Sequence, residues 1–166
     1  MQTEPPPFEA VETAGARIRL ADGRWLIDGI ASWWTAVHGY NHPHIIEAMA
    51  RQLRTMPHVM FGGLTHRPAL RLAERLAALL PGASTNAALQ HVFFADSGSA
   101  AVEIALKMAV QYWQNQGQTK RCKFVAFRRA YHGDTMGAMS VGDPNDGMHA
   151  LFGGYFPEQI LTDLPR

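Results

Sequence analysis

A short polar stretch, ADSGSAAVE at residues 95–103, holds the residue types best suited to binding a ligand. It follows the apolar run HVFFA and opens an alanine-rich helical pattern, so it lies where a strand should pass into a helix. Gly98 lets the backbone approach a ligand, Ser99 adds a hydroxyl donor, and the first N–H groups of a helix lack intrahelical partners. These features predict a phosphate site. Helix capping by Asp96 or Ser97 explains the same residues and stays an alternative.

A second group, YHGD at residues 131–134, follows the next apolar run, FVAF. If the two runs are neighbouring parallel strands, both end at the edge of the sheet where ligands of open α/β folds bind. The phenol ring of Tyr131 would then lie beside the phosphate site and could stack on a flat heterocycle. A half-buried core aromatic is the alternative for Tyr131. His132 and Asp134 fit either an acid–base pair or a local orienting group.

Other ligand motifs are missing from the sequence. It contains neither G-x-G-x-x-G after a strand nor the Gly-Lys-Ser/Thr of a P-loop, which leaves a mononucleotide or a phosphorylated vitamin as the ligand. His42 and His44 have an H-x-H spacing, but a helix start at Pro43 explains them, and no third ligand follows at a useful distance. We therefore predict no metal site.

The elements that must position these groups are predicted from hydrophobic periodicity and from Gly and Pro. A hairpin around the turn ADGR comes first, and an aromatic-rich loop, GIASWWTAVHGYNHP, follows it. Two helices then begin at prolines, and the rest alternates strand, helix and strand, which predicts a βαβ unit with parallel strands. The expected elements are strands at 17–20 and 25–28, helices at 43–56 and 68–80, a strand at 91–95, a helix at 99–116 and a strand at 123–127.

The bulk composition indicates a globular protein. The 166 residues are 47% hydrophobic and 17% charged, enough for one ordinary domain with a sizeable core. A formal net charge of +1 with scattered charges argues against nucleic acid as a partner. The single cysteine, Cys122, opens an apolar run, so we expect a small buried side chain in a reducing compartment. Without a secretory signal or 18 consecutive apolar residues, we expect a cytoplasmic protein and no membrane partner.

Four stretches together resemble a known family. They are DGIASWWTAVHGYNHP, MPHVMFGGLTHRPA, FFADSGSAAVEIALKMAVQYW and YHGDTMGAMSVGDP. The chain resembles the adenosylmethionine-8-amino-7-oxononanoate aminotransferases of biotin synthesis, within the class III pyridoxal-phosphate aminotransferases. SGS followed by E-x-A-x-K, and YHG, resemble the wider class. The Trp pair, GYNHP and HVMFGG resemble this family in particular.

The resemblance implies an α/β fold of the aspartate-aminotransferase-like type, also called fold type I. In that fold, residues 1–57 would be an N-terminal segment with a small-domain antiparallel hairpin, a loop and the first helix. Residues 58–166 would be the start of the large domain that binds pyridoxal 5'-phosphate, with its first βαβ part. The family is a homodimer with the active site at the subunit interface.

The resemblance also implies roles for particular residues. Gly98 and Ser99 would bind the phosphate of pyridoxal 5'-phosphate, and Tyr131 would lie against its ring and border the substrate. Trp33 matches a substrate-contacting tryptophan, and Trp34 stands beside it. The implied reaction transfers an amino group from S-adenosylmethionine to 8-amino-7-oxononanoate and gives 7,8-diaminononanoate.

The lysines of the sequence do not fit the Schiff base that this chemistry needs. Lys107 follows Glu103 by one helical turn, a spacing typical of an exposed i, i+4 pair. Lys120 and Lys123 lie at the amino end of the second strand, opposite the edge of the predicted cofactor site. We therefore expect no catalytic residue in this chain, which would be an inactive amino-terminal part of the enzyme. The alternatives are a class III aminotransferase of another amine, against which the Trp pair argues, and a non-catalytic protein that binds a phosphorylated ligand or a partner subunit.

Overall fold

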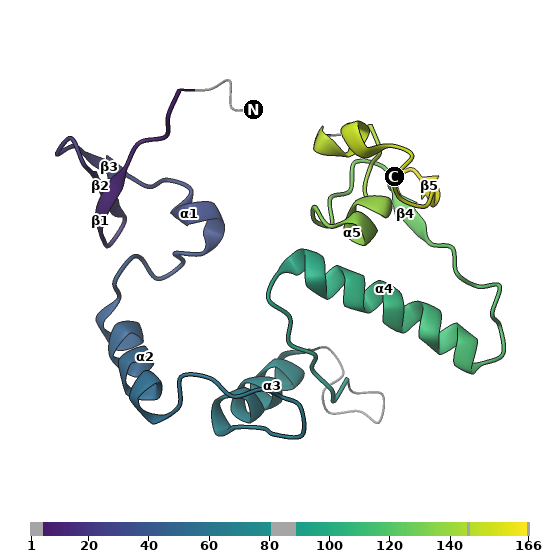
Figure 1. Ribbon diagram of the computed structural model, residues 1–166, viewed down its shortest axis with the longest axis horizontal. Helices are drawn as coiled ribbons and strands as arrows, with labels where there is room; N and C mark the ends of the chain where they lie inside the picture. Colours follow the sequence, from purple (N-terminus) through teal and green to yellow (C-terminus); the bar gives the residue numbers. More distant parts are fainter. Residues whose placement is uncertain (1–4, 81–88, 146, 166) are drawn as a thin grey trace. The chain divides into compact units, whose positions relative to one another are not determined.

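The computed structural model describes residues 5–80, 89–145 and 147–165, and the chain forms two compact units, Met1–Arg71 and Leu72–Arg166 (Figure 1). The units divide within helix α3 (Arg67–Leu79). The expected domain boundary between residues 57 and 58 stays a prediction.

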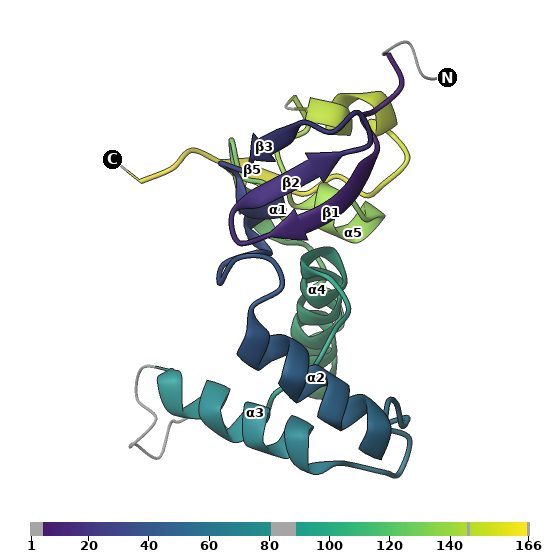
Figure 2. The ribbon, with the colours of Figure 1, turned by 90° about the vertical axis from the view of Figure 1, so that its left-hand side faces the viewer.

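The predicted hairpin is confirmed in the first unit. Strands β2 (Arg17–Leu20) and β3 (Trp25–Ile27) pair antiparallel (Figure 2). Asp22 and Gly23 form the turn, because Asp22 Oδ1 accepts a hydrogen bond from Arg24 N at 3.0 Å and Gly23 adopts a φ of 91°. The ADGR sequence therefore makes the turn that its residue types predict.

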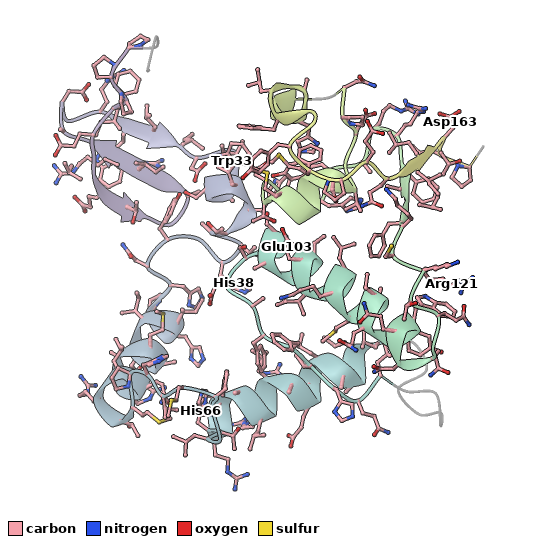
Figure 3. All side chains as sticks on the ribbon, turned by 45° about the vertical axis from the view of Figure 1, so that its right-hand side comes forward. Trp33, His38, His66, Glu103, Arg121 and Asp163 are labelled. Atoms are coloured by element: carbon pink, nitrogen blue, oxygen red, sulfur yellow. The ribbon has the colours of Figure 1, made fainter. Side chains whose placement is uncertain are left out.

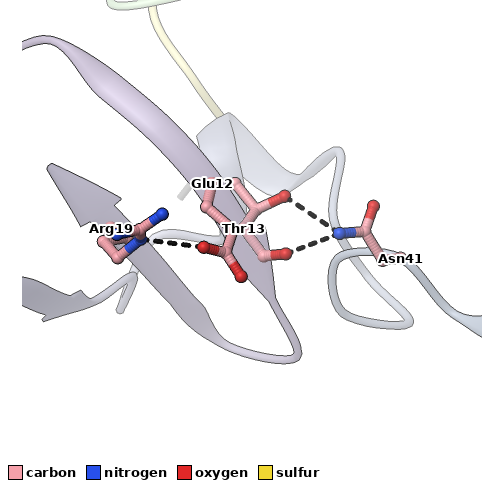
Figure 4. Close-up of polar contacts among 4 residues, drawn as sticks. All are labelled: Glu12, Thr13, Arg19 and Asn41. Atoms are coloured by element: carbon pink, nitrogen blue, oxygen red, sulfur yellow. Dashed lines mark hydrogen bonds and ion pairs between the residues drawn. The ribbon is translucent and has the colours of Figure 1, made fainter. Parts of the chain in front are cut away.

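The sheet has a third strand, β1 (Ala10–Ala14), which the sequence pattern does not reveal. It pairs antiparallel with β2, and the register shifts between Ala10 and Glu12. Most of its side chains are exposed, so it lacks the apolar alternation that marks a half-buried strand. Polar contacts secure it instead: Arg19 Nε lies 2.8 Å from Glu12 Oε2, and Asn41 Nδ2 donates to Thr13 O at 2.5 Å (Figure 4).

The loop after β3 contains one turn, α1 (Ala31–Trp34), before the first long helix. Helix α2 (Pro43–Thr55) starts with proline at its first turn, where the missing N–H costs nothing, and it ends just before Pro57. Helix α3 starts one residue before Pro68. Both helices lie where periodicity predicts them.

The second unit is built around helix α4 (Gly98–Asn115), the longest of the described helices. Ser97 caps its start, and Gly117 closes its end with a φ of 72°. Gln118 N donates to Trp113 O at 2.9 Å and Gly117 N to Gln114 O at 2.9 Å, which satisfies carbonyl groups of the last turn. The predicted helix at 99–116 is confirmed.

The predicted pairing of strands 91–95 and 123–127 is wrong. Strand β4 (Val125–Phe127) forms a parallel pair with β5 (Ile160–Thr162), and residues 91–95 belong to no strand in the described part of the chain. An apolar run shows that a segment suits a buried position, but a strand also needs a neighbour whose backbone groups match its own. In the described residues, the partner that β4 has is β5.

The second unit has a small core on β4 and around helix α5 (Met136–Ser140), which the 3-10 helix η1 (Gly147–Phe152) follows in the chain. Ala126, Ala138, Met139 and Val141 are its buried apolar residues. Cys122 is not part of it: the side chain is exposed, in contrast to the expected buried position, because the segment before β4 is not covered. In the described residues, no helix is both long and apolar enough to cross a lipid bilayer.

Candidate cofactor-binding site

The first turn of α4 offers two backbone donors to a ligand. Ser97, with an extended backbone, accepts a hydrogen bond from Ala100 N on its Oγ at 3.1 Å, and its carbonyl accepts from Ala101 N at 3.0 Å. Within the described ranges, no hydrogen bond occupies the N–H groups of Gly98 and Ser99. Capping by Ser97 therefore leaves two free donors at the positive end of the helix dipole.

The loop after β4 packs directly on this turn through Gly133 and Asp134. Asp134 N donates to Ser99 Oγ at 3.0 Å. Gly133 is buried with a φ of 122°, and a Cβ at that position would overlap the Ser99 hydroxyl and lie 2.9 Å from Ser99 Cα. A hydroxyl donates one hydrogen bond besides those it accepts, so the bond from Asp134 leaves the Ser99 proton available for an anion.

Tyr131 stands at the start of the same loop. Its hydroxyl donates to Asp134 Oδ2 at 2.9 Å, and this bond raises the pKa of Tyr131, because ionisation would break it and place a second negative charge beside the carboxylate. The phenol therefore stays protonated at neutral pH. Tyr131 is 69% exposed, and its ring stacks on His149, with ring centroids 6.2 Å apart and planes 21° from parallel.

His149 and Asp143 form polar contacts next to the Tyr131 loop. His149 is buried, its Nδ1 lies 3.1 Å from Asp143 O, and a Cβ on Gly142 would lie only 2.5 Å from the imidazole Cε1. The Asp143 carboxylate accepts from Asn145 N at 3.0 Å and from Arg129 N at 2.7 Å. These backbone donors lower the pKa of Asp143. The polar cluster fixes the chain on both sides of Tyr131.

Glu103 joins α4 to α5 (Figure 3). Its Oε1 accepts a hydrogen bond from Gly137 N at 2.7 Å, and a Cβ on Gly137 would lie 2.6 Å from the Glu103 carboxyl carbon. The expected ion pair with Lys107 is not among the salt bridges of the described residues. The half-buried carboxylate instead accepts a hydrogen bond from a backbone N–H at the start of α5, which has no partner within that helix. A spacing of four residues in the sequence cannot distinguish this contact from an ion pair with Lys107.

The structure brings together three of the predicted site residues and leaves two in the other unit. Gly98 and Ser99 meet the loop of Tyr131 at the start of α4, although the contact runs through Gly133 and Asp134 rather than through two neighbouring strand ends. His132 belongs to the same exposed loop.

Trp33 and Trp34 lie on α1 in the first unit (Figure 3). They are 80% and 81% exposed. Both residues have positive φ, 57° and 69°, which non-glycine residues rarely adopt. The two indole rings are therefore presented by a strained turn.

The start of α4 fits a phosphate-bearing cofactor. Two open N–H groups and the Ser99 hydroxyl converge there, and a Cβ on Gly98 would meet nothing within 4 Å, so a ligand can approach the backbone. Tyr131, which is exposed, is the first residue of the loop that packs on this turn. The arrangement suits an anion joined to a flat ring. Among the described residues, no three His, Cys, Asp or Glu side chains gather as metal ligands.

The lysines lie away from this turn. Lys107 is exposed on α4, and Lys123 Nζ donates to Glu158 O at 2.7 Å. Lys120 and Lys123 line a groove with Trp113 at the other end of α4. Arg121, labelled in Figure 3, lies there. Its guanidinium carbon is 3.8 Å from the centroid of the Trp113 ring.

Comparison with known proteins identifies similar sequences over the whole chain. The family described as aminotransferase class-III matches residues 1–166. An adenosylmethionine-8-amino-7-oxononanoate aminotransferase of Synechococcus elongatus is 54% identical over 158 residues, covering 95% of this chain and 35% of its own. The enzyme of the same name from Corynebacterium glutamicum is 48% identical over 154 residues, covering 93% and 35%. The chain thus spans little more than a third of the length of these relatives.

Solved structures show the same fold. The adenosylmethionine-8-amino-7-oxononanoate aminotransferase of Methanocaldococcus jannaschii matches with a TM-score of 0.86 and 30% identity over 96% of this chain and 35% of its own. An amine transaminase from an uncultivated Pseudomonas species, solved with bound pyridoxal phosphate, has a TM-score of 0.82 and 34% identity over the same shares. The fold is therefore part of the α/β fold of type I transaminases, as the sequence predicts.

Proposed function

Because the chain belongs to the class III aminotransferases, we propose that its residues are part of an enzyme that transfers an amino group from S-adenosylmethionine to 8-amino-7-oxononanoate, giving 7,8-diaminononanoate. The names of the similar proteins support this substrate pair. The observation that carries the proposal is the packing of the loop 131–134 on the first turn of α4, where Asp134 N donates to Ser99 Oγ at 3.0 Å.

The residues of the second unit would hold the cofactor. Class III aminotransferases depend on pyridoxal 5'-phosphate, which supplies the electron sink for amino transfer. In our proposal the N–H groups of Gly98 and Ser99 and the Ser99 hydroxyl bind its phosphate. Tyr131 lies against the ring and borders the substrate, with its hydroxyl oriented by Asp134. The resemblance to class III enzymes supports these assignments.

The first unit would contribute to the substrate side. Trp33 and Trp34 present two exposed indole faces, which suit the aliphatic chain of the amino acceptor. We propose that the lysine that binds the cofactor aldehyde is none of Lys107, Lys120 and Lys123, because two of them line a groove at the far end of α4. The enzyme would be a cytoplasmic homodimer, with the boundary between its small-domain segment and its large domain near residues 57 and 58.

Binding of the cofactor tests the phosphate assignment. In the complete enzyme, Ser99→Ala should weaken binding of pyridoxal 5'-phosphate about ten- to a hundredfold, the loss expected for one hydrogen bond to a charged group. Binding of pyridoxal, which has no phosphate, should weaken clearly less, because it loses only the support that Ser99 Oγ gives the Tyr131 loop through Asp134 N. Both constants are measured by titration of the cofactor absorbance. Thr119→Ala is the matched control, because Thr119 is an exposed hydroxyl residue beyond the C-terminal end of α4.

The outcomes separate the proposal from its alternatives. An equal loss for both ligands would contradict a phosphate contact at Ser99. An assay of amino transfer on the same enzyme decides the substrate: turnover of 8-amino-7-oxononanoate with S-adenosylmethionine supports the proposal, whereas turnover of other amines alone would assign it to a different class III aminotransferase. Binding of the phosphorylated ligand without any turnover would favour a non-catalytic binding protein.

A further inference from the structure

The turn that contains Trp33 and Trp34 has a left-handed backbone conformation, which residues other than glycine rarely adopt. Four successive non-glycine residues, Ala31 to Trp34, have φ values of 48°, 45°, 57° and 69°, and Ser32 and Trp33 have ψ values of 58° and 46°. This is the left-handed helical region, where the Cβ of an L-residue approaches the next carbonyl oxygen. Only Gly adopts it without a steric cost. A turn of this kind persists only where surrounding contacts impose it.

One carboxylate supplies those contacts. Asp28 Oδ2 accepts a hydrogen bond from Ser32 N at 2.8 Å and from the Tyr40 hydroxyl at 2.5 Å, and Asp28 Oδ1 accepts from Ile30 N at 3.2 Å. The Ser32 hydroxyl is 3.4 Å from the same Oδ2 and also contacts the Tyr40 hydroxyl. Asp28 therefore binds backbone donors before and within the turn.

The network is fixed to the three-stranded sheet on both sides. Asp28 N donates to Ala16 O at 2.9 Å, directly after β3. Tyr40 N donates to Gly15 O at 2.7 Å, and Gly15 N returns a bond to Tyr40 O at 3.2 Å. Backbone hydrogen bonds to the segment between β1 and β2 thus anchor both Asp28 and Tyr40, and the turn lies between these two anchored residues.

The consequence of this arrangement falls on Trp33 and Trp34. They lie in the strained turn, are 80% and 81% exposed, and take part in none of the hydrogen bonds of the Asp28 carboxylate. A turn that relaxed to right-handed φ and ψ would project both indole rings in other directions. The hand of the turn therefore decides where the rings are presented.

We propose that Asp28 is a positioning residue, which holds residues 31–34 in the left-handed turn and so fixes Trp33 and Trp34 for the amino acceptor. The role in substrate binding rests on the proposed function. Asp28 itself touches no substrate, and it acts through Ser32 N and the Tyr40 hydroxyl.

The structural part is tested by 19F NMR of the complete enzyme labelled with 5-fluorotryptophan. Asp28→Asn keeps the size of the side chain but leaves one acceptor oxygen in place of two, so the amide cannot accept from Ser32 N and the Tyr40 hydroxyl on one side and from Ile30 N on the other. The resonances of Trp33 and Trp34, assigned with Trp→Phe variants, should shift or broaden, while that of Trp113 in the other unit stays in place. Asp22→Asn is the matched control, because Asp22 bonds Arg24 in the hairpin turn. Unmoved Trp33 and Trp34 resonances in Asp28→Asn would overturn the proposal.

The functional part is tested by kinetics with a rescue. Asp28→Asn should raise KM for 8-amino-7-oxononanoate about tenfold with little change in kcat, and cofactor binding should stay the same. Adding Ala31→Gly should bring KM and the tryptophan resonances part of the way back, because glycine removes the steric cost at one of the four left-handed positions. If Ala31→Gly restored neither, Asp28 would act in another way and the positioning role would be wrong.

The two proposals fail separately. If the unchanged enzyme does not use 8-amino-7-oxononanoate, the proposed function is wrong, while shifted and rescued tryptophan resonances would still support the positioning role. If the enzyme turns over this substrate and Asp28→Asn changes neither KM nor the resonances, only the positioning role is wrong.

Discussion

Asp28 is the residue whose ionisation most directly affects the turn of Trp33. The bonds it accepts, the Tyr40 hydroxyl first, lower the pKa of Asp28 below its usual value. A group with a lowered pKa in the folded protein adds stability above its unfolded pKa, about 3.9, and this contribution is lost as the pH falls through the folded value. The same bond raises the pKa of Tyr40, so the stability from Tyr40 is present below about pH 10 and is lost as the pH rises through the raised value.

This linkage gives a prediction for acid conditions. The free energy of unfolding of the protein should exceed that of Asp28→Asn at pH 6, and the difference should shrink as the pH falls below about 4, because the carboxylate becomes protonated. Denaturant unfolding at pH 3, 4 and 6 measures both values. A difference that is constant over this range would show that the charge of Asp28 plays no part in the stability of the turn.

Single residues also show what a sequence can reveal about a site. Gly98, Ser99 and Tyr131 stand out because their types and their places at element ends suit a phosphate and a ring. Asp28 does not stand out, since it binds Ser32 and Tyr40 along a folded loop whose left-handed path has no periodicity. The sequence indicates Asp134 only as a partner of His132, whereas in the structure its carboxylate accepts from Tyr131 and its N–H donates to Ser99.

At the scale of elements, the close approach of the loop to α4 depends on Gly133. Gly133→Ala should weaken binding of pyridoxal 5'-phosphate about tenfold or more, because the added Cβ would overlap the Ser99 hydroxyl and push the loop from the helix. Gly154→Ala is the matched control, since Gly154 also has positive φ, 87°, but a Cβ there meets nothing within 4 Å. Cofactor titration of both variants is the measurement. Equal losses would mean that backbone strain, rather than contact with Ser99, matters.

The helices could be predicted from the sequence and the strands only in part. Proline starts and apolar spacing locate α2, α3 and α4, because a helix satisfies its backbone bonds within one segment. Strands depend on a partner elsewhere in the chain. The apolar run at 91–95 therefore predicts a neighbour of β4 that the structure does not show, while β5 at Ile160–Thr162 lies beyond a connection whose short elements have no clear periodicity.

For the whole molecule, the proposed origin of the catalytic lysine can be tested directly. Borohydride reduction of the 166-residue chain with pyridoxal 5'-phosphate should leave no specific lysine adduct, because Lys120 and Lys123 lie at the far end of α4 from Gly98 and Lys107 is on its exposed surface. Peptide mass spectrometry locates any adduct. A stoichiometric adduct on one of the three lysines would refute the assignment of the lysine to another part of the enzyme.

The length of α4 has a practical consequence. The helix has 18 residues, so its two ends are roughly 27 Å apart at 1.5 Å per residue. The exposed thiol of Cys122 follows its C-terminal end, while Gly98 and Ser99 lie at the other end. A fluorophore coupled to this thiol would be too remote to disturb the anion site, yet within range for energy transfer to a chromophore bound there. The length of α4 thus allows ligand binding at its start to be followed by energy transfer from a label at Cys122.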